Sequence, residues 1–236
     1  MKVLVMGGKG LVGQALVKAL GSVYEVEIVD LDGKPAVSKF DILHVAIPFQ
    51  GDFQVKVTQL AREYKVDNII VHSTVPTGTT RGISVNAVHS PILGQHDNLE
   101  ESIFRFTKWV GCASAISGRH ACSHMQNAGL DARILGKTED TETLKLLCLA
   151  RYLHDLAFYE NAEKIMGQFK GVEKNLLFKW NNAYNEGYKG TKFVRSNLSF
   201  PNGKIGGKCV AQNTKLLFDL TKNEMLKRDL ETFKLI

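Results

Sequence analysis

The chain has 236 residues, of which 44% are hydrophobic and 23% charged, with 21 glycines against 5 prolines. This length and composition suit a folded globular protein of one large or two small domains, and they exclude a disordered chain. The net charge of +6 arises mostly in the second half, where lysines are interspersed with acids and form no arginine-rich run. An anionic small molecule therefore fits better as a partner than nucleic acid.

The four cysteines stand far apart and form no CxxC pair; they are Cys112, Cys122, Cys148 and Cys209. Met1 is followed at once by a strand-like run and not by a signal peptide. No apolar run approaches the roughly 20 residues of a membrane span. His120 and His124 lie four residues apart without a third ligand, so no metal is expected. These features predict a cytoplasmic protein with reduced thiols and no membrane partner.

Short apolar runs alternate with helix-like stretches as far as Gly136. The expected strands cover residues 2–6, 24–30, 41–47, 68–73, 84–88, 107–111 and 131–136. The expected helices cover residues 12–20, 52–64 and 118–128. This alternation predicts a doubly wound α/β domain with a mainly parallel sheet over residues 1–136.

The pattern changes after Lys137. Residues 138–167 contain no proline, and no glycine before Gly167, and they repeat apolar residues at helical spacing. Thr138 and the acids that follow it suit a helix start. Further helices are expected over residues 172–187 and 211–228. We therefore predict a smaller all-helical domain over residues 137–236, whose long central helix has apolar residues on several faces and builds a homodimer.

A glycine motif, GKGLVG, lies between the first strand and the first helix. It comprises Gly8, Lys9, Gly10, Leu11, Val12 and Gly13. Such glycines allow a tight turn and a close approach of the backbone to a pyrophosphate. Asp30 ends the second strand, where a carboxylate binds ribose hydroxyls and repels a 2′-phosphate. The motif therefore predicts a Rossmann-type site for NAD, although the nearby Lys34 weakens the preference over NADP.

The ends of the third and fourth strands are expected at the same edge of the sheet. They supply AIPF, with Ala46 and Pro48, and HSTVPTGTT, with Ser73 and Thr74. STVPTGT resembles the STVPxGT element of the UDP-glucose/GDP-mannose 6-dehydrogenase family, within the 6-phosphogluconate-dehydrogenase-like superfamily. That resemblance implies that Thr74 lies near the nicotinamide and the reacting carbon. The doubled glycine before the motif is also similar to that of prephenate dehydrogenases.

The segment GKIGGKCVAQN resembles the GFGGSCFPKD of the same dehydrogenase family. The resemblance places Cys209 on the catalytic thiol, after Gly206 and Gly207. A thiol at a helix start, beside a lysine, is favoured as the reactive thiolate and can hold an aldehyde as a thiohemiacetal. The alternative is a small buried residue at a helix start. Asn213 replaces the acid of the family.

Two further residues are candidates for catalysis. Lys145 stands where the family has its active-site lysine, which would stabilise a developing oxyanion; Leu149 replaces the asparagine that accompanies it. The alternative is a solvated lysine on a helix face. His89 is a candidate general acid or base in the element where Ile92 replaces the glutamate of the family. A histidine satisfied by local backbone is equally compatible with the sequence.

The basic region before Cys209, together with Gly206 and Gly207, supplies the candidate substrate contacts. The resemblance assigns Tyr184, Asn185, Tyr188 and Arg195 to the phosphates of a sugar nucleotide, and an arginine suits phosphate or carboxylate. They could equally anchor the irregular loop.

Taken as a whole, the resemblance implies an NAD-dependent oxidoreductase that oxidises an alcohol of a sugar, a sugar nucleotide or another small anionic substrate. It implies a short form that lacks the C-terminal UDP-binding domain. Two alternatives stay open. One is a prephenate-like or hydroxyacid dehydrogenase that transfers a single hydride. The other is a catalytically silent dinucleotide-binding module, suggested by Leu149, Ile92 and Asn213.

Overall fold

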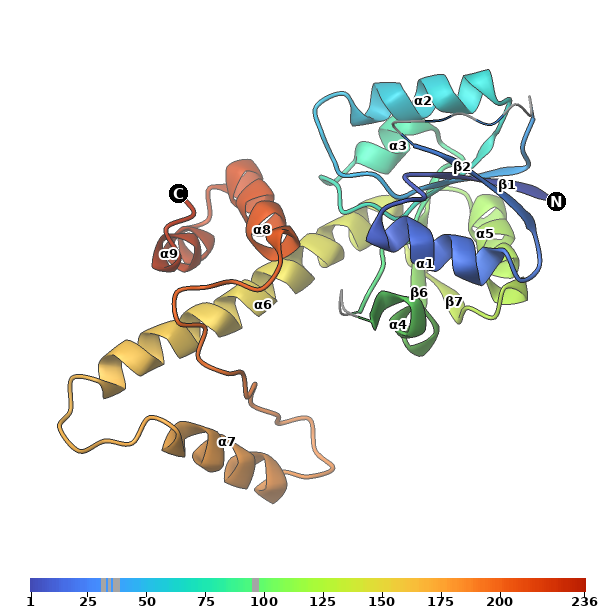
Figure 1. The fold of residues 1–236 in the computed structure, drawn as a ribbon. Coiled ribbons are helices and arrows are strands. Elements are labelled where there is room, and N and C mark those ends of the chain that lie inside the picture. Colours follow the sequence, from blue (N-terminus) through green and yellow to red (C-terminus); the bar gives the residue numbers. More distant parts are fainter. Residues whose placement is uncertain (31–32, 34, 36–38, 95–97) are drawn as a thin grey trace. The chain divides into compact units, whose positions relative to one another are not determined.

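A computed structural model describes residues 1–30, 33, 35, 39–94 and 98–236 (Figure 1). Lys34, which bears on the choice between NAD and NADP, lies outside the described residues. The chain forms two compact units, residues 1–145 and 146–236. The division falls inside helix α6 (Thr138–Met166) and not at Gly136, because the first turns of this helix are bonded to the first unit.

The first unit is built on a seven-stranded sheet in the order β2-β1-β3-β4-β5-β6-β7. Its strands are β1 (Lys2–Met6), β2 (Glu25–Val29), β3 (Ile42–Val45), β4 (Asn68–Val71), β5 (Val88–His89), β6 (Lys108–Cys112) and β7 (Ala132–Gly136). Neighbouring strands are parallel except that β6 runs antiparallel to β5. The predicted doubly wound, mainly parallel α/β fold is confirmed.

Helices cover both faces of this sheet (Figure 1). They are α1 (Leu11–Leu20), α2 (Phe53–Glu63), α3 (Thr79–Ile83), α4 (Leu99–Arg105) and α5 (Ala115–Asn127). One apolar core packs beneath α1, α4 and α5, and a second packs beneath α2. The alternation of β-strand side chains between two buried faces explains why the strands read as continuous apolar runs.

Two predicted elements differ from the structure. The strand expected over residues 84–88 is reduced to Val88–His89, because Ser84 accepts hydrogen bonds from the Asn86 and Ala87 N–H groups and turns the chain. The helix expected over residues 211–228 is two helices, α8 (Lys208–Thr221) and α9 (Glu224–Thr232). It breaks where Lys222 adopts a left-handed φ of 52° and the Asn223 side chain caps α9.

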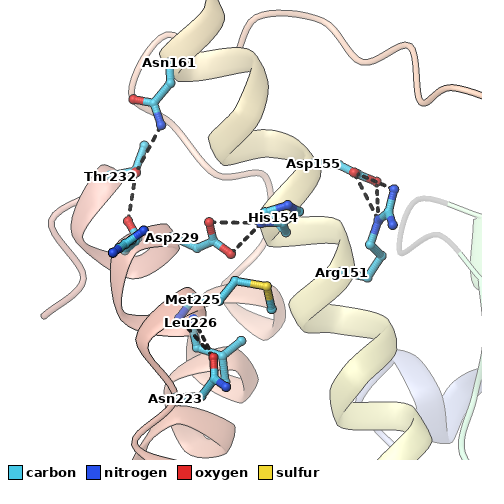
Figure 2. A network of polar contacts seen from close by, with 10 residues as sticks. Arg151, His154, Asp155, Asn161, Asn223, Met225, Leu226, Asp229 and Thr232 are labelled. Carbon is cyan, nitrogen blue, oxygen red and sulfur yellow. Dashed lines mark hydrogen bonds and ion pairs between the residues drawn. The ribbon is translucent and has the colours of Figure 1, made fainter.

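The second unit consists of the remainder of α6 with α7 (Leu176–Gly187), α8 and α9. The long helix predicted from the sequence is confirmed, and α7 begins four residues later than the sequence suggested, at Leu176. Figure 2 shows polar contacts that tie α9 to α6. His154 Nδ1 lies 2.9 Å from the buried Asp229 carboxylate, and Asn161 Nδ2 lies 3.5 Å from Thr232 Oγ1.

Within the described ranges, none of the helices combines the length and the apolar character that crossing a membrane would require.

The core beneath α5 contains a chain of three buried imidazoles. His44 Nδ1 lies 2.9 Å from His72 Nε2, and His44 Nε2 lies 2.9 Å from His124 Nε2. His72 Nδ1 lies 2.6 Å from the Ser90 carbonyl oxygen, which also accepts from Lys108 Nζ at 2.7 Å. All four side chains are buried. A polar chain thus runs through a core that is otherwise apolar.

Hydrogen-bond chemistry fixes the direction of this chain. The Ser90 carbonyl only accepts, so His72 Nδ1 donates and His72 Nε2 accepts from His44. His44 Nε2 then accepts from His124, whose Nδ1 is buried without a partner among the described residues. Burial lowers the pKa of His44 and His72 well below 6.5 and that of His124 to about 4. All three imidazoles are therefore neutral at pH 7.

We expect the first unit to lose stability as the pH falls below about 6.5. A lowered histidine pKa in the folded state means that the unfolded chain binds more protons, which costs up to about 1.4 kcal/mol per pH unit for each group. The loss continues down to the folded pKa, about 4 for His124 and about 3 for His89. The lowered pKa of buried Lys108 acts in the same direction as the histidines, and the raised pKa of buried Glu142 opposes them.

The measurement is urea unfolding at pH 7.5 and 5.5, followed by tryptophan fluorescence. The chain has two tryptophans. Replacing the exposed Trp180 with Phe leaves Trp109, in β6, as a reporter on the sheet. We expect the free energy of unfolding to fall by about 1 kcal/mol for each buried histidine over this range. Equal stability at both pH values would show that the imidazoles titrate normally.

Candidate functional site

The sheet topology gathers the predicted cofactor residues at one edge. Strand order advances from β1 to β2 on one side and to β3 on the other, so the carboxyl ends of β1 and β3 leave a crevice at this switch point. The segments that follow the strands there are the glycine turn after β1, Asp30 after β2, Ala46 to Pro48 after β3, and Ser73 and Thr74 after β4. The expected residues thus occupy neighbouring strand ends.

The glycines of the turn have different roles. A Cβ at Gly13 would lie 2.1 Å from the Gly7 carbonyl oxygen, and a Cβ at Gly8 would lie 2.6 Å from the Ile28 side chain. The fold therefore requires glycine at both positions. A Cβ at Gly10 would meet nothing closer than 3.4 Å, which is ordinary contact. The packing of the chain does not explain the glycine at position 10, whereas close approach by a ligand would.

The N-terminus of α1 is open to an anion. Gly10 occupies its cap position without a side-chain cap, and its first turn, which includes Leu11 and Val12, holds no acid. Unpaired N–H groups and the helix dipole favour negative charge there. Asp30 is half-buried, and its Oδ2 accepts from the Lys9 N–H at 3.1 Å. The acid at the end of β2 is thus held against the turn.

Ser73 fixes the start of the loop after β4. Its hydroxyl donates to the Ile47 carbonyl oxygen at 2.6 Å, which joins the ends of β3 and β4. Its own carbonyl oxygen lies 3.1 Å from His89 Nε2. The next residue, Thr74, is half-buried, and its hydroxyl makes no hydrogen bond within the described part of the chain. The loop is therefore anchored beside a hydroxyl that can still bind a ligand.

The environment of His89 argues against the predicted role as general acid or base. The ring is fully buried, with Nε2 on the Ser73 carbonyl and Nδ1 2.8 Å from Thr141 Oγ1. Burial lowers the pKa of His89 to about 3. Both ring nitrogens are thus in use and the ring is neutral at pH 7. The geometry favours the alternative in which His89 is satisfied by its surroundings and links Thr141 to Ser73.

Lys145 is anchored and is not a solvated lysine on a helix face. Its half-buried side chain donates to the Ile92 carbonyl oxygen at 2.8 Å, in the segment after β5. Its charge is near enough to contribute to lowering the pKa values of His89 and Lys108. A cation therefore lies beside the end of β5.

The second unit carries the cysteine segment. Cys209 is half-buried in the first turn of α8, directly after Gly207, which has a φ of +85°, and Lys208. Upstream, the Gly203 N–H donates to the Glu160 carboxylate at 2.8 Å, and that carboxylate also pairs with Lys164. Glu160 thus anchors the glycine-rich segment that leads to the thiol.

A hollow of about 340 Å³ lies beside this segment. Its lining residues are Gly203, Ile205, Gly207, Ala211, Phe233 and Leu235. A Cβ at Gly206 or Gly207 would meet nothing within 4 Å. The cysteine segment therefore borders an open, mostly apolar space.

The predicted substrate residues at the end of α7 form a cluster of their own. The Arg195 guanidinium lies 3.3 Å from the centre of the Tyr184 ring, and the centres of the Tyr184 and Tyr188 rings lie 4.9 Å apart with the rings tilted by 37°. The Asn185 side chain donates to the Arg195 carbonyl at 3.0 Å and accepts from its N–H at 2.8 Å. For Asn185 this favours loop anchoring over substrate contact. Arg195 itself is exposed.

The predicted site residues thus divide between the units. The glycine turn, Asp30, the strand-end loops, His89 and Lys145 belong to the first unit, whereas Cys209 and the Arg195 cluster belong to the second. The sequence does not predict the contact that Glu142 makes. This acid lies in the first turns of α6, as expected, and its carboxylate accepts hydrogen bonds from the N–H groups of Gly78 and Thr80. These partners lie more than 60 residues earlier in the chain, so no local sequence pattern signals the contact.

Comparison with known proteins shows the fold. No family model matches the chain, and no curated protein matches it. Solved structures do. UDP-D-ManNAc dehydrogenase from Pyrococcus horikoshii matches with a TM-score of 0.80 and 15% identity, over 99% of this chain and 68% of that one. UDP-glucose dehydrogenase from Pyrobaculum islandicum gives 0.78 and 15%, with the same coverage.

A third solved structure matches nearly end to end. 3-Hydroxyisobutyrate dehydrogenase from Mycobacterium tuberculosis has a TM-score of 0.74 and 12% identity, over 99% of this chain and 92% of that one. At sequence identities this low, the structural matches show that the fold is shared, and they show nothing finer.

The glycine turn predicts opposite outcomes for two neighbouring substitutions. Gly10→Ala should keep the stability of the fold but weaken NADH binding about tenfold or more, because a methyl group obstructs the approach of the pyrophosphate. Gly13→Ala should destabilise the fold, because the backbone of Gly7 cannot move away from the new Cβ.

Fluorescence titration with NADH and thermal unfolding measure the two effects. Gly167→Ala is the matched control, because the nearest atom to its Cβ also lies at 3.4 Å. Unchanged NADH affinity in Gly10→Ala would remove the assignment of this turn to a pyrophosphate.

Proposed function

We propose that this protein is an NAD-dependent dehydrogenase that oxidises an alcohol of a small anionic substrate, such as a sugar or sugar nucleotide. The observation that carries the proposal is the open turn at Gly10, which lies at the switch point of the sheet and beside Lys9, whose N–H donates to Asp30. The fold shared with three dehydrogenases supports it. The resemblance of STVPTGT and of the cysteine segment to sugar-nucleotide dehydrogenases narrows the substrate class.

The first unit suits a dinucleotide at three points. The N-terminus of α1 would hold the pyrophosphate, and Asp30 would bind the ribose hydroxyls and disfavour a 2′-phosphate. The loops at Ala46 and Pro48 and at Ser73 and Thr74 would border the other half of the molecule. When bound, NAD accepts the hydride of the alcohol carbon.

Residues of the chain would stabilise the charge on the alcohol oxygen and bind the anionic group of the substrate. The Lys145 ammonium, held at the Ile92 carbonyl, would stabilise the negative charge that develops on the alcohol oxygen as its proton passes to water. Thr74 would orient the same oxygen through its hydroxyl. Arg195, exposed on the second unit, would pair with an anionic group of the substrate.

Cys209 decides how far the oxidation goes. Its thiolate would add to the aldehyde carbon, giving a thiohemiacetal anion that would pass a second hydride to a second molecule of NAD and become a thioester. Water would then release the acid and the thiol. Ile92 and Asn213 replace the acids of the resembled family in that last step, so this chain lacks both of those carboxylates for the hydrolysis.

A single-step hydroxyacid oxidation is the second candidate. It is favoured by the match that spans 92% of 3-hydroxyisobutyrate dehydrogenase. In that reaction Lys145 serves as above and Cys209 takes no part. His89, neutral and fully bonded, is not proposed as the base in either reaction.

Labelling and turnover distinguish the two candidates. Iodoacetamide should modify Cys209 before the more exposed Cys148 if Cys209 is activated. A screen of sugar nucleotides, sugar acids and hydroxyacids with NADH readout should yield two NADH per substrate in the wild type and one in Cys209→Ser. One NADH in both proteins, with slow labelling, would favour the hydroxyacid reaction. NADH binding without any turnover would indicate a silent module.

We also propose that α6 builds a homodimer. Large apolar side chains are exposed along it; they include Leu144, Leu147, Tyr152, Phe158 and Ile165. A second copy of the same helix would cover them. Sedimentation at micromolar concentration should therefore give twice the chain mass of 26.2 kDa. A single species at the chain mass would contradict the dimer.

A further inference from the structure

Three consecutive residues of α6 are bonded to the segment around the loop after β4. Thr141 contacts His89, which in turn contacts the Ser73 carbonyl. Glu142 accepts from the Gly78 N–H at 2.6 Å and from the Thr80 N–H at 2.7 Å. Thr143 Oγ1 lies 2.9 Å from Thr77 Oγ1. The start of α6 thus grips this loop at several points along its length.

Glu142 is the unusual member of this set because it is a fully buried carboxylate. No cation pairs with it among the described residues, and both of its oxygens are used by main-chain N–H groups. Burial, the largest cause, raises the pKa of Glu142 above 4.5. Burying an acid without a cation is costly. In this position the carboxylate fixes the loop backbone at Gly78 and Thr80.

Thr74 is the residue whose position these anchors fix. The loop is fixed just before it by Ser73, through the Ile47 and His89 contacts, and after it by Glu142 at Gly78. Its own hydroxyl makes no hydrogen bond in the described ranges of the chain. The anchors therefore set the position of the Thr74 hydroxyl without forming a hydrogen bond with it.

The sheet order locates this hydroxyl relative to a dinucleotide. The glycine turn and Asp30 follow β1 and β2, which suit the pyrophosphate and the adenosine ribose. The other nucleotide half of such a ligand extends across the switch point, over the ends of β3 and β4. Thr74 follows β4 and is therefore placed on the nicotinamide side.

We propose that Glu142 is a positioning residue for the nicotinamide half of the cofactor, acting by fixing the loop that carries Thr74. This inference rests on the proposed function. It adds a residue that touches neither cofactor nor substrate. It also separates the cofactor site into two parts, one governed by the glycine turn and one governed by α6.

The test compares two ligands on the full chain. ADP-ribose occupies only the part governed by the glycine turn, whereas NADH occupies both parts. In Glu142→Gln the side-chain NH₂ meets a main-chain N–H, so one of the two anchors is lost. We expect this variant to bind NADH about tenfold more weakly and to bind ADP-ribose within about twofold of the wild type. Calorimetry measures both affinities, and thermal unfolding follows the fold.

The matched control is Arg81→Gln. Arg81 also joins α3 to α6, through Glu139 at 3.4 Å, but that ion pair is exposed and contributes little to stability. Both affinities should be unchanged in the control. Loss of NADH binding in Arg81→Gln as well would overturn the specific role of Glu142.

The outcomes separate the two hypotheses. If the wild type binds neither ligand, the proposed function fails. If the wild type binds both and Glu142→Gln binds NADH equally well, the positioning role fails while the proposed function stands. If Glu142→Gln binds neither ligand, Glu142→Asp decides. Weakened NADH binding with intact ADP-ribose binding in Glu142→Asp supports the role, and equal weakening of both overturns it.

Discussion

The contact between Gly13 and the Gly7 carbonyl sets the geometry on which the first unit depends. A Cβ at position 13 would stand 2.1 Å from that oxygen, so α1 can approach β1 only because the side chain is absent. This close approach aims the N-terminus of α1 at the edge where β1, β2 and β3 end. It also leaves the Gly10 position open, where a backbone free of side chains faces the crevice of the sheet.

The structure fixes the remaining strand ends by polar contacts buried among apolar side chains. Ser73 ties β4 to β3, His89 ties β5 to the same loop, and Glu142 ties the loop to α6. Each is a hydrogen bond with a main-chain group, so these contacts fix the loop relative to β3, β5 and α6. The Thr74 hydroxyl remains available to a ligand at this edge, at the cost of burying an acid and several histidines.

The sequence predicted the features that have a strong local signal. Alternating apolar runs located most strands, and GKGLVG between a strand and a helix located the turn. The short helices α3 and α4 carry too few residues for a periodic pattern, and the break at Lys222 depends on one left-handed residue. The pairing of Glu142 with Gly78 joins positions far apart in the chain. No local pattern reports such a contact, and the same holds for His89.

The chain of buried imidazoles formed by His124, His44 and His72 also has a dipole. Its three N–H groups all point the same way, from His124 through His44 and His72 to the Ser90 carbonyl. Aligned neutral groups polarise one another and add to a single dipole. The positive end lies at His72, the residue directly before Ser73 and Thr74, and the negative end lies at the unpartnered Nδ1 of His124. The three neutral imidazoles thus turn a positive potential toward the end of β4.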